Sequence, residues 1–172
     1  MVRTVLYLIN PERYFEGVVS IFKHEIGDRY AVYVTTNKPY NHIINLFKEE
    51  GIDTSRIFFI DCITREVSTG KIPEPPNCLF VESLQDMTAI AIAINTGIEH
   101  LPGHKILLLD SLSTLLLYND SKVVGQFSNF LLNKLRIQEM DGIMLALESD
   151  MDHTIIKTIE SFMDEVRKCC PK

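Results

Sequence analysis

Short apolar runs alternate with amphipathic stretches along most of the chain. The runs are four to seven residues long and rich in β-branched and aromatic side chains, which is typical of buried strands. The expected strands cover 4–10, 30–36, 56–61, 105–110, 142–149 and 165–169, with a short extended piece at 78–83. Apolar residues at helical spacing predict helices over 11–26, 39–50, 84–98, 121–139 and 153–163.

The junctions between these elements carry matching start and stop signals. Asn10 caps the first helix and Pro11 takes its first position, while Gly27 and Gly51 end the first and second helices. The segment 62–77, which holds three prolines, interrupts the rhythm and predicts an irregular loop. Strands that alternate with helices predict a mostly parallel sheet with helices on both sides. We therefore expect a single α/β domain over 1–172, built as a three-layer αβα sandwich.

The stretch KILLLDSLSTLLLYN, residues 105–119, is the most informative part of the sequence. Four apolar residues lead directly into Asp110, and the hydroxyl residues Ser111 and Ser113 follow. This is the pattern of the strand that places the magnesium-side aspartate in P-loop ATPases. Such an ATPase also needs a phosphate-binding loop, G-x-x-x-x-G-K-[ST], between its first strand and first helix.

The sequence between the first strand and the first helix does not contain that loop. The junction is NPERYFEGVV, in which Gly17 is the only glycine and no Lys-Ser or Lys-Thr pair follows. The only Gly-Lys pair, Gly70-Lys71, precedes Ile72-Pro73 and has arginine where the first glycine belongs. Tyr14 and Phe15 are bulky, and we expect them to fill the space that a nucleotide would otherwise occupy.

Three segments together resemble the RecA superfamily of ATPases. They are LLLDSLSTLLLYND, the helical VVGQFSNFLLNKLRIQ and the strand GIMLALES, and the earlier VYVTTNKPYNHIINLFKEEGID and RIFFID fit the same pattern. KaiC-like and RadA-like proteins are the nearest, and the chain is similar to truncated archaeal forms without a phosphate loop. The resemblance covers about residues 4–168 and implies a RecA-like sheet.

The resemblance also implies roles for individual residues. Asp110 matches the family's magnesium-side aspartate, and Ser111 matches the hydroxyl beside it. Where KaiC-like proteins place catalytic glutamates after the second strand, this chain has Thr35-Thr36-Asn37. Phosphoryl transfer depends almost entirely on positioning and charge stabilisation, so losing these elements removes most of the catalysis. We therefore expect no catalytic residues and an interaction or regulatory role.

An alternative rests on the edge of the sheet where the strands end. Ligands of open parallel sheets bind at the carboxyl ends of the strands. The polar residues expected there are Asn10, Thr35, Thr36, Asp61, Asp110, Glu148 and Ser149, followed by Asp150, Asp152 and His153. Oxygen ligands suit Mg²⁺ or Mn²⁺, so Asp110 and Glu148 are candidates for a metal- or nucleotide-binding enzyme. A third alternative is a subunit whose phosphate loop comes from a partner. Our prediction is no cofactor, with Mg²⁺ or ATP as the alternative.

The composition of the chain limits the kinds of partner that we expect it to bind. The 172 residues include 17 Lys and Arg against 23 Asp and Glu, a net charge of −6, which disfavours general nucleic-acid binding. No secretory signal or membrane span is visible, so we expect a cytoplasmic protein that binds a protein partner or itself. The four cysteines lack zinc-site spacing, and we expect Cys169-Cys170 to be reduced thiols.

Overall fold

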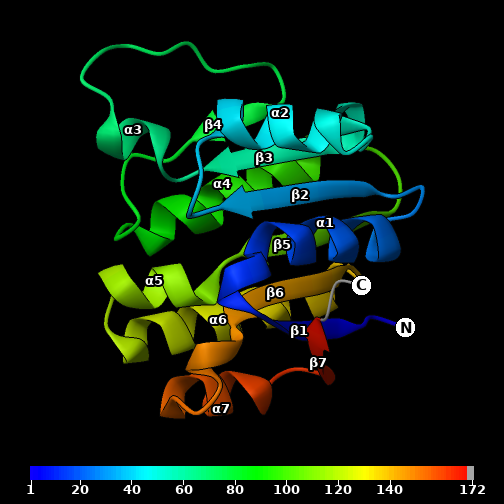
Figure 1. Cartoon of the computed structure of the whole chain (residues 1–172), viewed down its shortest axis with the longest axis vertical. Coiled ribbons are helices and arrows are strands. Elements are labelled where there is room, and N and C mark those ends of the chain that lie inside the picture. The colour runs from blue at the N-terminus through cyan, green and yellow to red at the C-terminus, as the bar shows by residue number, and fades with distance from the viewer. Residues whose placement is uncertain (170–172) are drawn as a thin grey trace.

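The computed structural model describes residues 1–169, which form a seven-stranded sheet covered by helices on both faces (Figure 1). The strand order is β4-β3-β2-β5-β6-β1-β7, and every pair of neighbours is parallel. The strands are β1 (Thr4–Ile9), β2 (Tyr30–Thr35), β3 (Ile57–Asp61), β4 (Cys78–Phe80), β5 (Lys105–Asp110), β6 (Asp141–Leu147) and β7 (Glu165–Cys169). This confirms the predicted α/β class and the αβα layers.

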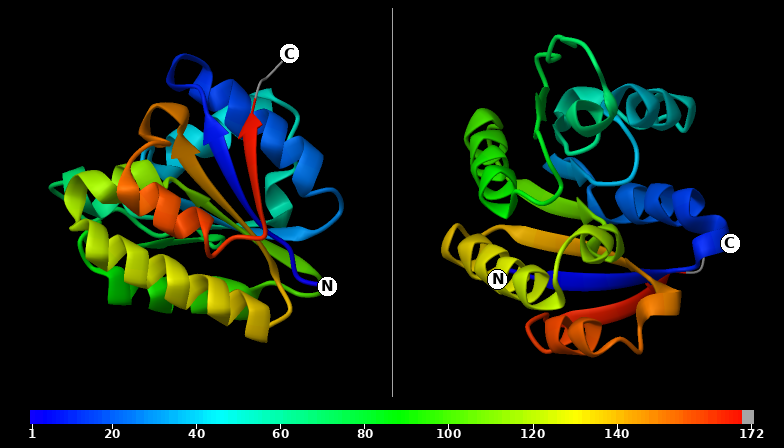
Figure 2. Two further views of the ribbon diagram at one scale, coloured as in Figure 1. Left: turned by 90° about the horizontal axis from the view of Figure 1, so that it is seen from below. Right: turned by 90° about the vertical axis from the view of Figure 1, so that its left-hand side faces the viewer.

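Each face of the sheet has its own apolar core and its own set of helices (Figure 2). The helices are α1 (Tyr14–Glu25), α2 (Tyr40–Glu49), α3 (Thr64–Val67), α4 (Met87–His100), α5 (Leu112–Tyr118), α6 (Ser121–Ile137) and α7 (Thr154–Glu160). The core on one face contains side chains of α1 and α2, and the core on the other contains side chains of α4, α5, α6 and α7. None of the helices within residues 1–169 combines the length and apolar character that a membrane crossing requires.

The predicted strands are confirmed because their apolar runs are locally unambiguous. Residues Ile106 to Leu109 of β5 are completely buried, as expected for a central strand with helices on both sides. β7 is an edge strand, as predicted, and ends at Cys169, which is buried; Cys170 lies outside the described residues. β6 ends at Leu147, so Glu148 begins a 3₁₀ turn, Glu148–Asp150, instead of continuing the strand.

The helix predictions need four corrections. Pro11 does not begin the first helix, because Asn10 caps a separate 3₁₀ turn at Pro11–Arg13 and α1 begins at Tyr14. The predicted helix 84–98 begins only at Met87, where the Asp86 side chain accepts a hydrogen bond from the Ala89 amide at 2.9 Å. Two helices, α3 inside the predicted loop and α5 after Asp110, were not predicted. α7 covers only Thr154–Glu160 of the predicted 153–163.

Gly17, the glycine in the first helix, permits a close approach of α1 to the sheet. A Cβ atom at this position would lie 2.7 Å from Cγ2 of Ile9 at the end of β1. Such a contact is too short for two carbon atoms, so only glycine lets the helix pack at this distance. The glycine therefore has a packing role, and it holds Tyr14, one turn earlier, close to the ends of the strands.

Candidate functional site

The polar residues predicted to meet at the carboxyl edge of the sheet do occupy that edge. Thr35 of β2 is level with Asp61 of β3 on one side and with Asp110 of β5 on the other. Asn10 follows β1 and Glu148 follows β6, two strands that also pair in parallel. A parallel sheet brings all strand ends to one edge, so the topology alone accounts for this arrangement.

Asp110 is buried at this edge, and protein side chains surround its carboxylate. The residue as a whole is only 3% exposed to solvent. The Tyr14 hydroxyl donates a hydrogen bond to Oδ1, and the Asn37 Nδ2 donates a second at 2.9 Å. The Tyr33 hydroxyl donates to Oδ2 at 2.5 Å. Both carboxylate oxygens therefore already have donors from α1, β2 and the loop after β2.

Burial sets the protonation behaviour of this cluster. Loss of water contact raises the pKa of Asp110 above its usual range, and the hydrogen bonds from Tyr14, Tyr33 and Asn37 partly oppose that rise. The pKa values of Tyr14 and Tyr33 are raised well above normal, first by burial and then by the nearby Asp110 charge. Both phenols therefore keep their protons and remain donors to the carboxylate.

Ser111, the second residue of the predicted motif, stabilises the chain turn after β5. Its side chain caps α5 by accepting a hydrogen bond from the Thr114 amide at 3.3 Å. The peptide bond between Asp110 and Ser111 is cis. The Thr36 hydroxyl donates to the Asp110 carbonyl and accepts from the Ser111 amide, both at 2.8 Å. These hydroxyl groups therefore bond to the backbone of the turn.

Asn10 and Thr35 also bond to backbone groups close to them in the chain, and Asp61 bonds to nearby amides and to the more distant Tyr40 amide. Asn10 accepts from the Glu12 amide at 2.9 Å, and Thr35 Oγ1 donates to the Lys38 carbonyl at 2.7 Å. The buried Asp61 carboxylate accepts from the amides of Ile63 and Thr64 at 2.7 and 2.8 Å, and from the Tyr40 amide at 2.8 Å. Asp61 thereby joins the starts of α2 and α3 to the end of β3.

Glu148 and Asp150, which lie after the end of β6, are each close to a basic side chain. Glu148 Oε1 lies 3.3 Å from the Lys168 ammonium group on β7, and Asp150 Oδ1 lies 4.0 Å from His153 Nδ1. Within residues 1–169, no three His, Cys, Asp or Glu side chains are grouped so that they could hold a metal ion. The expected acidic rim is thus divided among separate local pairs.

Aromatic side chains occupy the junction between β1 and α1. Phe15 stacks on Phe47 of α2 with 6.4 Å between ring centres, and the Lys38 ammonium lies 5.4 Å from the centre of the Phe15 ring. Tyr14 turns toward Asp110, as its hydrogen bond shows. The only turn between the strand and the helix is the short one at Pro11–Arg13.

Two residues of this site, Tyr33 and Asn37, were not predicted as site residues. Tyr33 lies in a strand that looks uniformly apolar, and Asn37 attracted notice only as part of the segment that replaces the glutamates. The one available signal is the tyrosine itself, because a buried phenol requires a hydrogen-bond partner that phenylalanine does not. Sequence spacing gave no indication of that partner, since Tyr33 and Asp110 are 77 positions apart.

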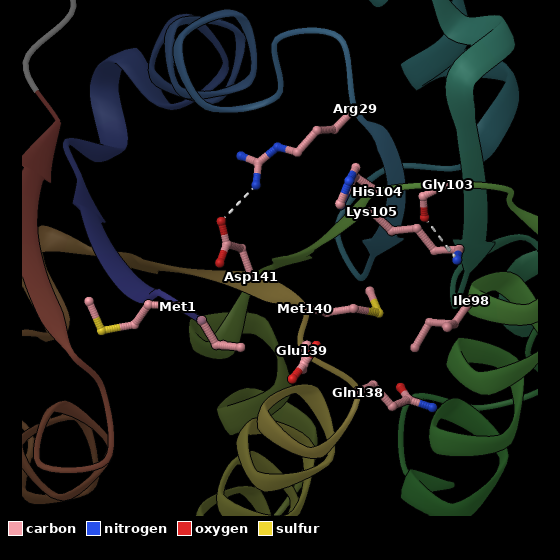
Figure 3. Close-up of a pocket in the computed structure, with 11 residues that line it drawn as sticks. Met1, Arg29, Ile98, Gly103, His104, Lys105, Gln138, Glu139, Met140 and Asp141 are labelled. Atoms are coloured by element: carbon pink, nitrogen blue, oxygen red, sulfur yellow. Dashed lines mark hydrogen bonds and ion pairs between the residues drawn. The ribbon is translucent and has the colours of Figure 1, made fainter.

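A hollow of about 920 Å³ lies at the opposite edge of the sheet, where the strands begin (Figure 3). Its lining combines both charges, and the Arg29 guanidinium is already paired with the Asp141 carboxylate at 2.6 Å. None of the residues predicted as site candidates lines it. Ligands of parallel sheets bind at the carboxyl edge, so we place the candidate site around Asp110 and not in this hollow.

Comparisons with known proteins bear on the fold. A model of a family of unknown function (DUF7504) matches residues 19–167. The KaiC-like protein PH0186 from the hyperthermophilic archaeon Pyrococcus horikoshii OT3 is similar in structure, with a TM-score of 0.62 and 15% sequence identity. The similarity covers 95% of this chain and 70% of that one. No curated protein matches the chain. The predicted RecA-like fold is therefore confirmed.

Proposed function

Because the chain belongs to DUF7504, a family of unknown function, and has a RecA-like fold, we propose that it is a non-catalytic RecA/KaiC-like domain that acts through protein interactions. Nucleotide hydrolysis is lost in this proposal. The observation that carries it is the state of Asp110, whose two carboxylate oxygens accept hydrogen bonds from Tyr14, Tyr33 and Asn37. A carboxylate that served a magnesium ion would instead present an oxygen to the metal.

The junction between β1 and α1 supports the same proposal. A phosphate-binding loop uses glycines so that backbone N–H groups approach the phosphates, and a lysine to reach the outer ones. This chain has Asn10-Pro11-Glu12-Arg13 and then the aromatic pair Tyr14-Phe15. Proline lacks an N–H group, and both aromatic side chains pack inward against neighbours from other elements. The junction therefore offers little that could bind phosphate.

Exposed apolar side chains support the interaction role. Ile92 on α4 is 64% exposed, and Phe130 and Ile137 on α6 are 54% and 84% exposed. Large apolar side chains gathered on one surface are typical of protein-binding faces. The net charge of −6 disfavours nucleic acid as the partner. We therefore propose a protein partner or a second copy of the chain.

A thermal-shift series tests whether nucleotide binding is lost. The purified protein is melted with MgATP, MgADP, MgGTP, Mn²⁺ alone and EDTA. A ligand at about 100 times its Kd would stabilise the fold by ~2.7 kcal/mol, which is roughly 5–10 °C for a chain of this size. We expect no shift with any of them.

Two variants identify the cause of a thermal shift, if one is observed. A nucleotide shift that disappears in Asp110→Asn would contradict the proposal and restore the ATPase alternative. A shift with Mn²⁺ that disappears in Glu148→Gln would favour the metal-dependent alternative. Asp53→Asn, at an exposed carboxylate on another part of the surface, is the control and should behave as the wild type in every condition.

A further inference from the structure

The last strand of the sheet, β7, leaves one of its two hydrogen-bonding sides open. Within residues 1–169 it pairs only with β1, and Figure 2 shows it at the rim of the sheet with no further strand beyond it. A strand bonds to one neighbour through alternate residues, so the other residues of β7 leave backbone N–H and C=O groups available. An open side of this kind can accept another strand.

The charges along β7 change sign around Val166. Asp164 and Glu165 precede this valine, and Arg167 and Lys168 follow it. We call residues 164–168 the β7 charge motif. If two copies of the motif run antiparallel about the valine, every acidic residue lies opposite a basic one. The motif is therefore complementary to a second copy of itself.

Val166 is an apolar side chain at an open edge of the sheet. It is 44% exposed, although Leu6, its neighbour at the same level of β1, is completely buried. Edge strands usually carry charged side chains, especially lysine, that discourage pairing with another chain. The centre of the β7 charge motif lacks that protection, and a valine from a second strand would cover the exposed one.

We propose that two copies of the chain pair through β7, antiparallel, with a two-fold axis at Val166. Side chains that lie opposite each other in antiparallel strands share one face of the sheet, so the axis must pass through a residue. An axis at Val166 places Glu165 opposite Arg167 of the second copy, and Asp164 opposite Lys168. An axis at Glu165 or at Arg167 would bring two like charges together. The charges therefore select Val166, and the two sheets join into one.

The charged groups next to α1 allow a second copy to approach. Arg167 lies 2.6 Å from Glu165 and 3.6 Å from Glu25 of α1, and Arg3 lies 3.9 Å from Glu165. This group contains two acidic and two basic side chains and has no net charge. Glu165 and Arg167 are both partly exposed, so each can also face its opposite in the second copy.

The remaining pair, Asp164 and Lys168, also has groups to spare. Asp164 accepts both bonds from Thr4 through Oδ2, each at 2.8 Å, and its Oδ1 accepts no hydrogen bond within residues 1–169. Lys168 lies 3.3 Å from Glu148, but an ammonium group has three donors. Lys168 can therefore contact Glu148 of its own chain and Asp164 of the second copy together.

This inference rests on the proposed interaction role, because it names a second copy of the chain as a partner. It does not depend on the loss of nucleotide binding, since β7 contributes no residue to the cluster around Asp110. The exposed apolar residues of α4 and α6 are not part of it either. The two proposals can therefore fail separately.

The first test measures molecular mass in solution. One pair of short strands is a small interface, so we expect a weak dimer over a concentration series up to roughly 300 µM in sedimentation equilibrium. Val166→Lys places two like charges at the axis and should raise the dissociation constant at least about tenfold. Val67→Lys makes the same change at an exposed valine on α3 and should leave the dimer intact.

Charge reversal tests the opposing pairs. Lys168→Glu should weaken the dimer roughly tenfold, because two acidic residues then face each other on both sides of the axis. Lys157→Glu is the matched control. Lys157 is an exposed lysine on α7 that lies 3.7 Å from Glu160 of its own chain, so its reversal changes the net charge equally and should leave the affinity unchanged.

Cross-linking tests the position of the axis. A cysteine on the axis faces the same cysteine of the second copy, so Val166→Cys should give a covalent dimer with a short bismaleimide. The variant is made in a Cys170→Ser background, and Cys62, Cys78 and Cys169 are buried. Val67→Cys in the same background should remain uncoupled. Circular dichroism and the melting temperature of each variant show that it is folded.

The outcomes are distinct from those of the nucleotide experiment. A wild-type chain that is monomeric throughout the series would overturn the pairing, and so would a dimer that tolerates both Val166→Lys and Lys168→Glu. A dimer in which Val166→Cys does not cross-link would overturn the axis at Val166. A nucleotide-induced thermal shift would contradict the loss of nucleotide binding and leave all of these results unaffected.

Discussion

The Tyr14 hydroxyl donates a hydrogen bond to the Asp110 carboxylate across 96 positions of the chain. The contact joins the start of α1 to the end of β5. Tyr33 and Asn37 complete the set of donors around the same carboxylate. The cluster therefore stabilises the edge of the sheet where we predicted a site.

Tyr14→Phe removes one donor and leaves the ring in place. A hydrogen bond to a buried charged group contributes about 2 kcal/mol, so we expect the free energy of unfolding to fall by that amount. Urea denaturation followed by circular dichroism gives the value. Tyr118→Phe, at a half-exposed tyrosine on α5, is the matched control and should change stability by no more than about 0.5 kcal/mol. A loss equally small for Tyr14→Phe would mean that the contact contributes nothing.

The pH dependence of stability reports on the burial of Asp110. The pKa of Asp110 is raised in the folded state. The contribution of Asp110 to the free energy of unfolding is therefore fully present below the usual carboxyl pKa near 3.8 and is lost as the pH rises through the raised pKa. Asp110→Asn cannot ionise and avoids that loss. The stability of the wild type relative to Asp110→Asn should therefore fall with rising pH above 3.8, by at most about 1.4 kcal/mol per pH unit.

Asp164 supplies the control with the opposite sign. Hydrogen bonds from the Thr4 amide and hydroxyl, both at 2.8 Å, lower the pKa of Asp164. Its contribution is present above the usual value near 3.8 and is lost as pH falls through the lowered pKa. The stability of the wild type relative to Asp164→Asn should therefore change with pH only below the usual carboxyl pKa. Parallel curves for the two comparisons would refute the assignment of the Asp110 trend to burial.

Asp61→Ala should destabilise the fold by about 3 kcal/mol, because it leaves several buried or half-buried amides without an acceptor. The amides are those of Tyr40, Ile63 and Thr64. Chemical denaturation is again the measurement. Asp53 caps a 3₁₀ turn from an exposed position, accepting from the Ser55 amide at 3.0 Å. Asp53→Ala should cost about 1 kcal/mol or less, and equal losses at the two positions would contradict the structural role of Asp61.

Glu139→Gly should raise the free energy of unfolding by about 1 kcal/mol, because glycine adopts a positive φ without strain. Urea denaturation followed by circular dichroism measures the change. Gly51 has a φ of +74°, and a Cβ atom there would meet no other atom within 4 Å. Gly51→Ala should therefore lower the free energy of unfolding by a similar amount, through the strain of the positive φ alone. A destabilising Glu139→Gly would show that the side chain already has a structural role within one chain.

The strands were predictable because their signal is local. A run such as Ile106 to Leu109 is apolar on both faces wherever it lies in a parallel sheet, and Gly27 and Gly51 end their helices with the positive φ angles that glycine allows. Helix α5 was missed because three consecutive leucines, 115–117, hide its helical periodicity. α3 was missed because the prolines that follow it dominate the segment.

The candidate site was predictable only in part. Parallel topology places Thr35, Asp61 and Asp110 at one edge, and this follows from the order of elements in the chain. The donors around Asp110 come from positions 73 to 96 residues away, so only the folded structure brings them together. The contact of Glu148 with Lys168 was not predictable, because it depends on β7, which no local pattern connects to β6.

The position of β1 has a consequence for the order in which the chain can fold during its synthesis. β1 is completed within the first ten residues, yet both of its hydrogen-bonding sides are filled by the last two strands, β6 and β7. While the ribosome makes everything in between, its six buried residues have no strand to join. The first strand of the sheet to be translated is therefore the last to be paired, and it must remain protected from aggregation until β6 and β7 emerge.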